Sequence, residues 1–333
     1  MRVGKLTPKE LEENVFRHLT ERREEICLRS GLGEDSTIFN FGGQFCVMST
    51  DPITGAVEDA GWLAVHISAN DVVSNGADPV CCLLTILAPA GCEVAAIDRV
   101  MQDAARAARE LKIEISGGHT ELTTSVNQMV LSSTVVGKVD RDHIIKTSGA
   151  LAGDDIVVSK TIGLEGTSIL AKDAASALLK WFSADLIQTA SQLGKLISVV
   201  PEGRISAAFG VHAMHDITEG GLLGAVYEMA SGAGKGFLLE GKAVPLHPAT
   251  EEFCRRLQLN PLRLIASGSM LIATDRGSAL VEKLAEGGIS AAVIGKFTSE
   301  TEKILIHANG REIVAPPEGD ELWRALDLLS RES

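Results

Sequence analysis

The sequence lacks several features that mark common classes of protein. Its longest apolar run, from Val80 to Gly91, is shorter than the roughly 20 residues that a membrane-spanning helix needs. The first residues, Met1 to Glu13, are polar and charged, so they do not resemble the basic and apolar leader of an exported protein. We therefore expect a cytoplasmic protein with no membrane partner.

Closely spaced cysteines and an excess of basic residues are also missing. The six cysteines include no CxxC pair, which argues against a zinc site and against a disulfide framework. Acidic residues exceed basic ones by 44 to 31, and the formal net charge of −13 disfavours non-specific binding to nucleic acid. Nucleotides remain possible ligands, because backbone N–H groups and a divalent cation on carboxylates can hold phosphates.

A chain of 333 residues is long enough for two domains of roughly 150 residues each. The segment Gly149–Asp154 has the composition of a boundary, so we predict domains at residues 1–150 and 151–333. Amphipathic periodicity predicts a helix over Ala95–Leu111, and strands and helices alternate after the boundary. These patterns predict an α/β (α+β) protein.

The most informative stretch runs from Ser68 to Pro79. It continues an apolar segment that predicts a helix over Gly61–Gly76, yet it places Asn70 and Asp71 inside that helix. An aspartate is costly to bury alone and needs a cation or hydrogen-bond donors. A single Asn-Asp pair is equally compatible with a turn or a cap, so other segments have to be weighed with it.

Two earlier segments carry acidic residues of a compatible kind. The loop Ser30–Ser36 contains Asp35 and is compatible with a metal-binding loop or with a surface turn. Asp51 follows a strand predicted over Phe45–Met48, and site residues are common where strands of α/β folds end. An aspartate before proline is also a frequent turn residue.

Glycine-rich and polar segments follow later in the chain. In the loop predicted at Ser116–Glu121, paired glycines permit close approach of a ligand to the backbone. The turn Lys160–Ser168 can bind an anion at a helix N-terminus, although it has neither P-loop nor GxGxxG spacing. Asp216 precedes a glycine pair and a predicted helix over Leu222–Ala230, which it can simply cap.

Taken in order, the motifs GLGEDS, STDP, SANDVVSNGADP, SGGHTE and HDITEGGL resemble those of the aminoimidazole ribonucleotide (AIR) synthetase superfamily. That ATP-binding group includes thiamine-monophosphate kinase, selenophosphate synthetase and HypE. The resemblance runs from about Gly31 to Phe297, and HDITEGGL is similar to the DPTRGGL of HypE-like, AIR synthase-related proteins. It implies two domains, a β-barrel shared between the N-terminal domains of a homodimer, and a C-terminal α/β sandwich.

The resemblance also implies roles for individual residues in binding ATP and Mg²⁺. Metal and phosphate would be held by carboxylates, the nucleotide would lie along Asn and glycine-rich segments, and acidic groups and a histidine would act in catalysis. The metal residues would be Asp35, Asp51 and Asp71; the nucleotide-binding residues Asn70, Gly117, Gly118, Thr120, Gly163 and Gly166; and the catalytic residues Asp71, His119 and Asp216.

The sequence departs from HypE at its end, because HypE carries a C-terminal cysteine as acceptor and the last cysteine here is Cys254. We therefore expect no cysteine acceptor. The sequence favours an enzyme, an ATP-dependent ligase, dehydratase or phosphotransferase, that phosphorylates an amide or carbonyl oxygen of an unknown acceptor, with hydrogenase maturation as its context. Two alternatives stay open: a non-catalytic ATP-binding maturation partner or scaffold, and a small-molecule kinase resembling thiamine-monophosphate kinase.

Overall fold

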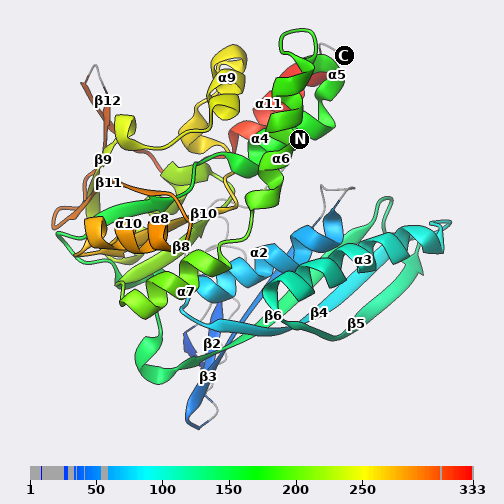
Figure 1. The fold of residues 1–333 in the computed structure, drawn as a ribbon, viewed down its shortest axis with the longest axis horizontal. Coiled ribbons are helices and arrows are strands. Elements are labelled where there is room, and N and C mark those ends of the chain that lie inside the picture. Colours follow the sequence, from blue (N-terminus) through cyan, green and yellow to red (C-terminus); the bar gives the residue numbers. More distant parts are fainter. Residues whose placement is uncertain are drawn as a thin grey trace. The chain divides into compact units, whose positions relative to one another are not determined.

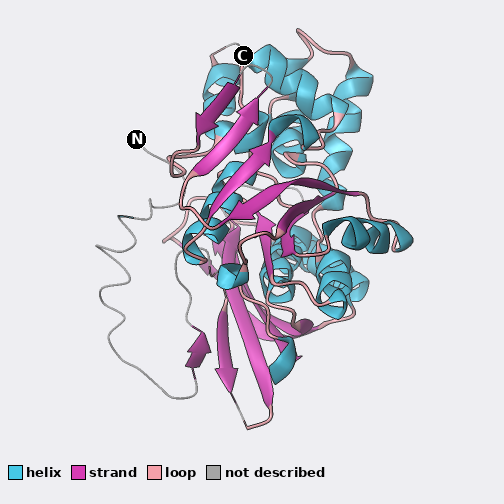
Figure 2. Ribbon diagram, turned by 90° about the vertical axis from the view of Figure 1, so that its left-hand side faces the viewer, coloured by secondary structure: helices cyan, strands magenta, loops and turns pink. Residues whose placement is uncertain are grey.

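The structure, a computed structural model, describes residues 9, 26–28, 34, 36–40, 42–53, 59–307 and 310–331. These residues fall into two compact units that divide between Ile144 and Ile145. We call the described residues from 26 to 144 the N-terminal unit and Ile145–Arg331 the C-terminal unit. Figure 1 follows the chain through both units, and Figure 2 separates helices from strands.

The N-terminal unit is built on one six-stranded sheet with the order β1-β2-β3-β6-β4-β5. All neighbouring strands are antiparallel except β4 and β5, which run parallel because a helix connects them. The strands are β1 (Ile26–Leu28), β2 (Thr37–Asn40), β3 (Gln44–Ile53), β4 (Asp78–Pro89), β5 (Glu114–Thr123) and β6 (Val130–Asp140).

Two helices, α2 (Ala60–Ser74) and α3 (Val94–Leu111), pack together on this sheet (Figure 1). They approach closely at Gly61, where a Cβ atom would lie 2.0 Å from the carbonyl oxygen of Val100. The residues of α2 are buried on almost every side, because it contacts β3, β4 and β6 as well as α3. The predicted helix is therefore confirmed, and its Asn-Asp pair lies in the interior.

The C-terminal unit contains a seven-stranded sheet with the order β13-β12-β9-β11-β7-β10-β8. Only β12 and β9 are parallel neighbours among these strands. The strands are β7 (Asp155–Ser159), β8 (Ala213–Ile217), β9 (Gly236–Glu240), β10 (Ser269–Thr274), β11 (Ala291–Thr298), β12 (Lys303–His307) and β13 (Gly310–Ile313).

Helices cover this sheet and add a second core beside it. The first core packs α8 on residues such as Ile156, Leu271 and Phe297, while α7 and α10 contact the sheet through β10, β7 and β11. The second core joins α4, α6, α9 and α11 around Phe253. The helices are α4 (Leu164–Asp173), α5 (Ala175–Leu178), α6 (Ala184–Gln192), α7 (Val200–Phe209), α8 (Gly221–Gly232), α9 (Pro248–Leu257), α10 (Gly277–Glu286) and α11 (Glu321–Ser330), with 3-10 turns at Arg141–His143, Thr147–Gly149, Leu193–Leu196, Gly241–Ala243 and Pro261–Arg263.

The mixed α/β class is confirmed, but two motifs lie in different local structure from the one predicted. β3 does not stop at Met48; it continues through Ile53, so Asp51 lies within a strand. The SGGHTE segment is not a loop, because Ser116–Glu121 forms most of β5. In both cases pairing with a neighbouring strand overrides the local preference of proline or glycine for turns.

Candidate functional site

Asp71 lies on the face of α2 that packs against the N-terminal sheet. Its side chain is 5% exposed, and its carboxylate accepts a hydrogen bond of 2.6 Å from the Ser49 hydroxyl on β3. A buried carboxylate with such a short hydrogen bond remains a strong ligand for a cation or for further donors. This contact fixes the direction of the Asp71 side chain.

Asp51 and Ser133 form a second polar pair in the same layer. They are directly opposite each other on β3 and β6, and Asp51 lies two residues from Ser49, so all three face α2. The Ser68 hydroxyl on α2 donates to the Ser133 carbonyl oxygen at 3.1 Å. Within the described residues, Asp51 Oδ2 and Ser133 Oγ are buried and have no hydrogen-bond partner.

This layer, the α2–β3–β6 polar layer of Ser49, Asp51, Ser68, Asp71 and Ser133, has the donor chemistry that hard divalent cations prefer. Carboxylate and hydroxyl oxygens suit Mg²⁺, and a buried carboxylate oxygen without a partner is costly unless a ligand satisfies it. Among the residues that the structure describes, no three His, Cys, Asp or Glu side chains form a preassembled metal cluster. The third predicted metal residue, Asp35, lies outside the described residues.

Asn70 is completely buried beside Asp71 on α2. Its carbonyl oxygen accepts a hydrogen bond of 2.8 Å from the Ser74 hydroxyl near the end of the helix. The bond from Ser74 goes to the Asn70 main chain, whereas the bond from Ser49 holds the Asp71 side chain itself. Sequence reasoning missed Ser49; its spacing of two from Asp51 on one strand, which places both side chains on one face, was the available signal.

The SGGHTE residues lie on β5, one of the two edge strands of the N-terminal sheet among the described strands. His119 and Thr120 are exposed, and His119 Nε2 lies 3.2 Å from Glu121 Oε2. Gly118 has a φ of +147° and packs so tightly on β4 that a Cβ atom would lie 1.9 Å from the Leu84 carbonyl oxygen. Gly117 meets only the Leu83 side chain, at 3.4 Å. Strand pairing alone therefore requires Gly118, whereas Gly117 has no such constraint.

Gly163 and Gly166 lie at the buried beginning of α4 in the C-terminal unit. Gly163 has a φ of +74° as the residue before the helix, and a Cβ atom on Gly166 would lie 2.6 Å from the Leu264 side chain. The Gly166 N–H donates to the Ile265 carbonyl oxygen at 3.1 Å. Close packing explains both glycines, and their nucleotide-binding role stays a prediction.

Asp216 lies on β8 and is 1% exposed. Among the described strands β8 lies at one edge of its sheet, and its Asp216 stands opposite Met270 of β10. The neighbouring residue, His215, lies on the opposite face of the strand, and its Nε2 lies 3.1 Å from Glu228 Oε2 on α8. A turn from Thr218 to Gly221 joins this strand to α8, and it is the segment that resembles DPTRGGL.

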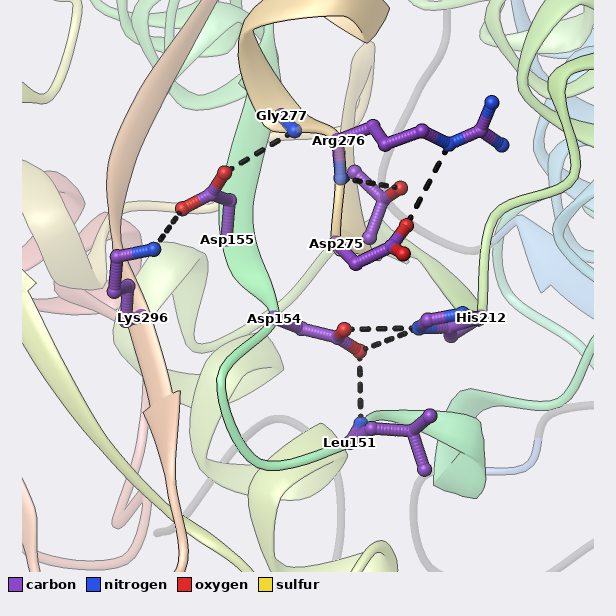
Figure 3. A network of polar contacts seen from close by, with 9 residues as sticks. Leu151, Asp154, Asp155, His212, Asp275, Arg276, Gly277 and Lys296 are labelled. Carbon is purple, nitrogen blue, oxygen red and sulfur yellow. Dashed lines mark hydrogen bonds and ion pairs between the residues drawn. The ribbon is translucent and has the colours of Figure 1, made fainter.

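A further polar network ties the strands of the C-terminal unit together at one end (Figure 3). Asp154 accepts a hydrogen bond from the Leu151 N–H at 2.8 Å and lies 2.8 Å from His212 Nδ1. Asp155 accepts from the Gly277 N–H at 3.1 Å and from Lys296 at 2.6 Å. Both carboxylates are engaged by neighbouring elements, so this network stabilises β7, α10 and β11.

None of the helices in the described part of the chain is long and apolar enough to cross a lipid bilayer. The fold and the buried Asp-Ser layer thus define a two-unit α/β protein with a polar interior under α2. Two family models cover both units: AIR synthase related protein, N-terminal domain, over residues 33–139, and AIR synthase related protein, C-terminal domain, over residues 152–308.

Sequence relatives extend this finding. The carbamoyl dehydratase HypE of Cupriavidus necator is 30% identical over 247 residues, which cover 72% of this chain and 68% of the relative. A putative hydrogenase expression/formation protein of Methanocaldococcus jannaschii is 28% identical over 335 residues and 96% of each chain. The chain belongs to the AIR synthase-related family and is a HypE-like member of it.

Solved structures share the two-unit fold. A structure of a HypE–HypF complex matches with a TM-score of 0.76 at 21% identity, over 92% of this chain and 99% of that chain. A HypE structure in complex with ATP matches at 0.69 and 24% identity, over 94% and 95%. A ThiL structure complexed with AMPPCP and TMP matches at 0.73 and 20% identity, over 92% and 95%.

Proposed function

We propose that this protein is an ATP- and Mg²⁺-dependent enzyme that activates an amide or carbonyl oxygen of its acceptor by phosphorylation. The observation that supports this most directly is the α2–β3–β6 polar layer, in which Asp71 is buried and Asp51 keeps a buried oxygen without a partner in the described residues. Membership of the AIR synthase-related family and the ATP complex of HypE support the nucleotide. Relatives named for hydrogenase formation support metalloenzyme maturation as the context.

The residues of the layer fit a bound Mg²⁺. Asp51 and Asp71 would hold it directly or through water, and Ser133 offers a hydroxyl beside Asp51. When bound, the cation neutralises negative charge on the phosphates, which carboxylates could not otherwise approach. The short hydrogen bond from Ser49 keeps Asp71 oriented, so little reorganisation is needed when the nucleotide arrives.

The proposed reaction transfers the γ-phosphoryl group of ATP to the acceptor oxygen. A bond forms between that oxygen and the γ-phosphorus, the bond to the bridging oxygen breaks, and ADP leaves. Such transfers depend mainly on positioning and charge stabilisation. We propose that His119, whose Nε2 lies 3.2 Å from Glu121 Oε2, accepts the proton that the acceptor loses, and that Asp216 acts in catalysis as the family resemblance implies.

One argument about the acceptor comes from Cys254, the last cysteine in the sequence. Cys254 is 2% exposed within the second core of the C-terminal unit, and burial raises the pKa of its thiol to about 12. A protonated, enclosed thiol is a poor nucleophile. We therefore favour an oxygen of a small molecule or of a partner protein as the acceptor, and a kinase related in fold to ThiL is the second candidate.

The central test is binding of ATP with and without Mg²⁺, measured by calorimetry on three proteins. Asp71→Asn removes the charge and keeps a side chain that can still bond to Ser49, so we expect ATP affinity to fall at least about tenfold. Ser49→Ala is the matched control, because it removes the hydrogen bond and keeps the carboxylate. We expect Ser49→Ala to weaken binding by less than about threefold.

Two results would contradict the proposal. If wild-type protein binds ATP equally well after removal of Mg²⁺ with EDTA, the metal role of the layer is wrong. If Asp71→Asn binds Mg-ATP like wild type, Asp71 lies outside the site. ADP release in the presence of candidate acceptors then separates an enzyme from a non-catalytic ATP-binding partner.

A further inference from the structure

Asp320, the residue before α11, is a buried carboxylate whose hydrogen-bond donors all come from the main chain. Its Oδ2 accepts from the Gly220 N–H at 2.7 Å. Its Oδ1 accepts from the Ile265 N–H at 3.1 Å and from the Leu322 N–H at 2.8 Å. One side chain thus joins the turn before α8, the segment after the Pro261–Arg263 turn, and the first turn of α11.

This arrangement exceeds what helix capping requires. Ser183 before α6 accepts one N–H, from Leu186, and Asn260 accepts one, from Leu262. The bond from Leu322 is the equivalent capping bond of Asp320, and a serine or asparagine would supply it equally well. The two bonds from Gly220 and Ile265 are additional, and they need both oxygens of a carboxylate.

The turn from Thr218 to Gly221 is held at further points by the same surroundings. The Thr218 carbonyl oxygen accepts hydrogen bonds from the Gly221 N–H at 3.1 Å and the Ala266 N–H at 3.4 Å. Gly221 has a φ of +63°, and a Cβ atom there would lie 2.7 Å from the Leu262 carbonyl oxygen. Trp323 Nε1 on α11 donates to Glu219 Oε1 at 3.4 Å. The turn is therefore enclosed by backbone on one side and by α11 on the other.

The Thr218–Gly221 turn follows directly on β8, the strand that carries Asp216, so its position affects the position of that strand end. β8 is an edge strand that pairs only with β10 among the described strands. The ladder to β10 fixes one side of the strand, and the anchor at Gly220 fixes its carboxyl end. Loss of that anchor would leave the end of β8 free to shift by a fraction of an ångström or more, which is enough to misplace a catalytic group.

We propose that Asp320 is a positioning residue that fixes the Thr218–Gly221 turn and, through it, the carboxylate of Asp216. This inference rests on the proposed function, in which Asp216 acts in phosphoryl transfer. Asp320 itself contacts neither nucleotide nor acceptor in this view. Its effect reaches the reaction only through the position of the turn.

The most selective variant is Asp320→Asn. Its side-chain oxygen can keep the bonds to Leu322 and Ile265, while its NH₂ group faces the Gly220 N–H and cannot accept from it. The matched control is Asp327→Asn on the same helix, which removes the same charge from an exposed residue paired with Arg331. Two kinds of measurement are made on both variants: amide hydrogen exchange at Gly220, and steady-state kinetics that give kcat and KM for ATP.

For Asp320→Asn we expect exchange at Gly220 to become at least about tenfold faster, and kcat to fall about tenfold with KM for ATP changed less than about threefold. Asp327→Asn should match wild type in both. A general loss of stability would instead speed up hydrogen exchange throughout the C-terminal unit. It would lower the fraction of folded, active protein without the selective exchange at Gly220. Unchanged exchange at Gly220, or faster exchange with unchanged kcat, would overturn the proposal.

The hydrogen-exchange measurement also separates this inference from the proposed function. Absence of ATP turnover in wild-type protein would contradict the proposed function, and it would be seen without any variant. The anchoring of Gly220 by Asp320 is judged independently by exchange, since that readout needs neither ATP nor an acceptor.

Discussion

Asp51 and Asp320 show how differently two carboxylates can be accommodated in one chain. Asp320 uses both oxygens to accept backbone N–H groups, so its bonding capacity serves the fold. Asp51 keeps one buried oxygen without a hydrogen-bond partner among the described residues. A group that the protein leaves unsatisfied in its interior is a better candidate for a ligand than one that the main chain saturates.

The burial of Asp320 predicts a pH dependence of stability. Burial raises the pKa of Asp320 from 3.8 to about 6, against the opposing effect of its three N–H donors, and nearby Glu219 adds to the rise. The native state then binds the proton more tightly than the unfolded state. The contribution is therefore fully present below about pH 4 and is lost as the pH rises through about 6, by at most about 3 kcal/mol.

This prediction is checked by comparing urea unfolding of wild type and Asp320→Asn between pH 4 and 7. Other carboxylates titrate in the same range, so the informative quantity is the difference between the two proteins. We expect the wild-type free energy of unfolding to fall relative to the variant as the pH rises. Parallel pH profiles would show that Asp320 does not titrate as described.

A second residue-scale prediction concerns Cys254. Because burial raises its thiol pKa to about 12, we expect no carbamoyl or cyano adduct on Cys254 after incubation with ATP and a carbamoyl donor. Cys254→Ser should keep ATP turnover within about twofold, while the buried hydroxyl lowers stability by about 1–3 kcal/mol. Intact-protein mass spectrometry and a turnover assay test both statements. An adduct on Cys254 would restore a HypE-type acceptor at a new position.

At the scale of elements, the paired glycines of β5 differ in what they tolerate. Gly118→Ala would add a Cβ atom 1.9 Å from the Leu84 carbonyl oxygen at a φ of +147°, so we expect a loss of at least about 3 kcal/mol of stability. Gly117→Ala is the control, because its nearest neighbour is the Leu83 side chain at 3.4 Å. Thermal unfolding of both variants is the measurement, and equal melting temperatures would contradict the tight β4–β5 packing.

The sequence predicted the helices that carry a clear amphipathic pattern or a long apolar run. The amphipathic helix expected over Ala95–Leu111 is found as α3, and the helix over Gly61–Gly76 is found as α2. The helix expected after the domain boundary at Leu222–Ala230 is found as α8. In α3 burial of one apolar face agrees with the local preference for a helix, whereas α2 is recognisable from its apolar run because it is buried on almost every side.

The sequence was less informative where tertiary pairing overrides local chemistry. Proline after Asp51 and glycines at 117 and 118 favour turns, yet both segments are strands because β6 and β4 supply pairing partners. The sequence also did not show which residues lie beside the acidic residues in the fold. Ser133 lies 82 positions from Asp51 along the chain, and only the register of β3 and β6 brings them together.

At the scale of the whole molecule, the face of the N-terminal sheet opposite α2 and α3 carries exposed apolar residues on β4. Residues of β4 alternate, so Leu84 and Ile86 are buried under the helices while Leu83 is 43% exposed on the opposite side and Leu87 is partly exposed. Exposed apolar residues along a long strand favour a partner surface. We propose that this face pairs with a second copy of the chain, as the resemblance to AIR synthase-related proteins implies.

Replacing Leu83 tests this assembly directly. Leu83→Glu places a charge on the face that would be buried between two copies, so we expect the dimer to dissociate at micromolar concentration. Val94→Glu is the matched control, because Val94 is 73% exposed at the start of α3, on the helix side of the sheet. Light scattering should give a dimer for wild type and Val94→Glu and a monomer for Leu83→Glu. A wild-type monomer that binds Mg-ATP normally would show that one copy suffices for nucleotide binding and that the exposed face of β4 has another use.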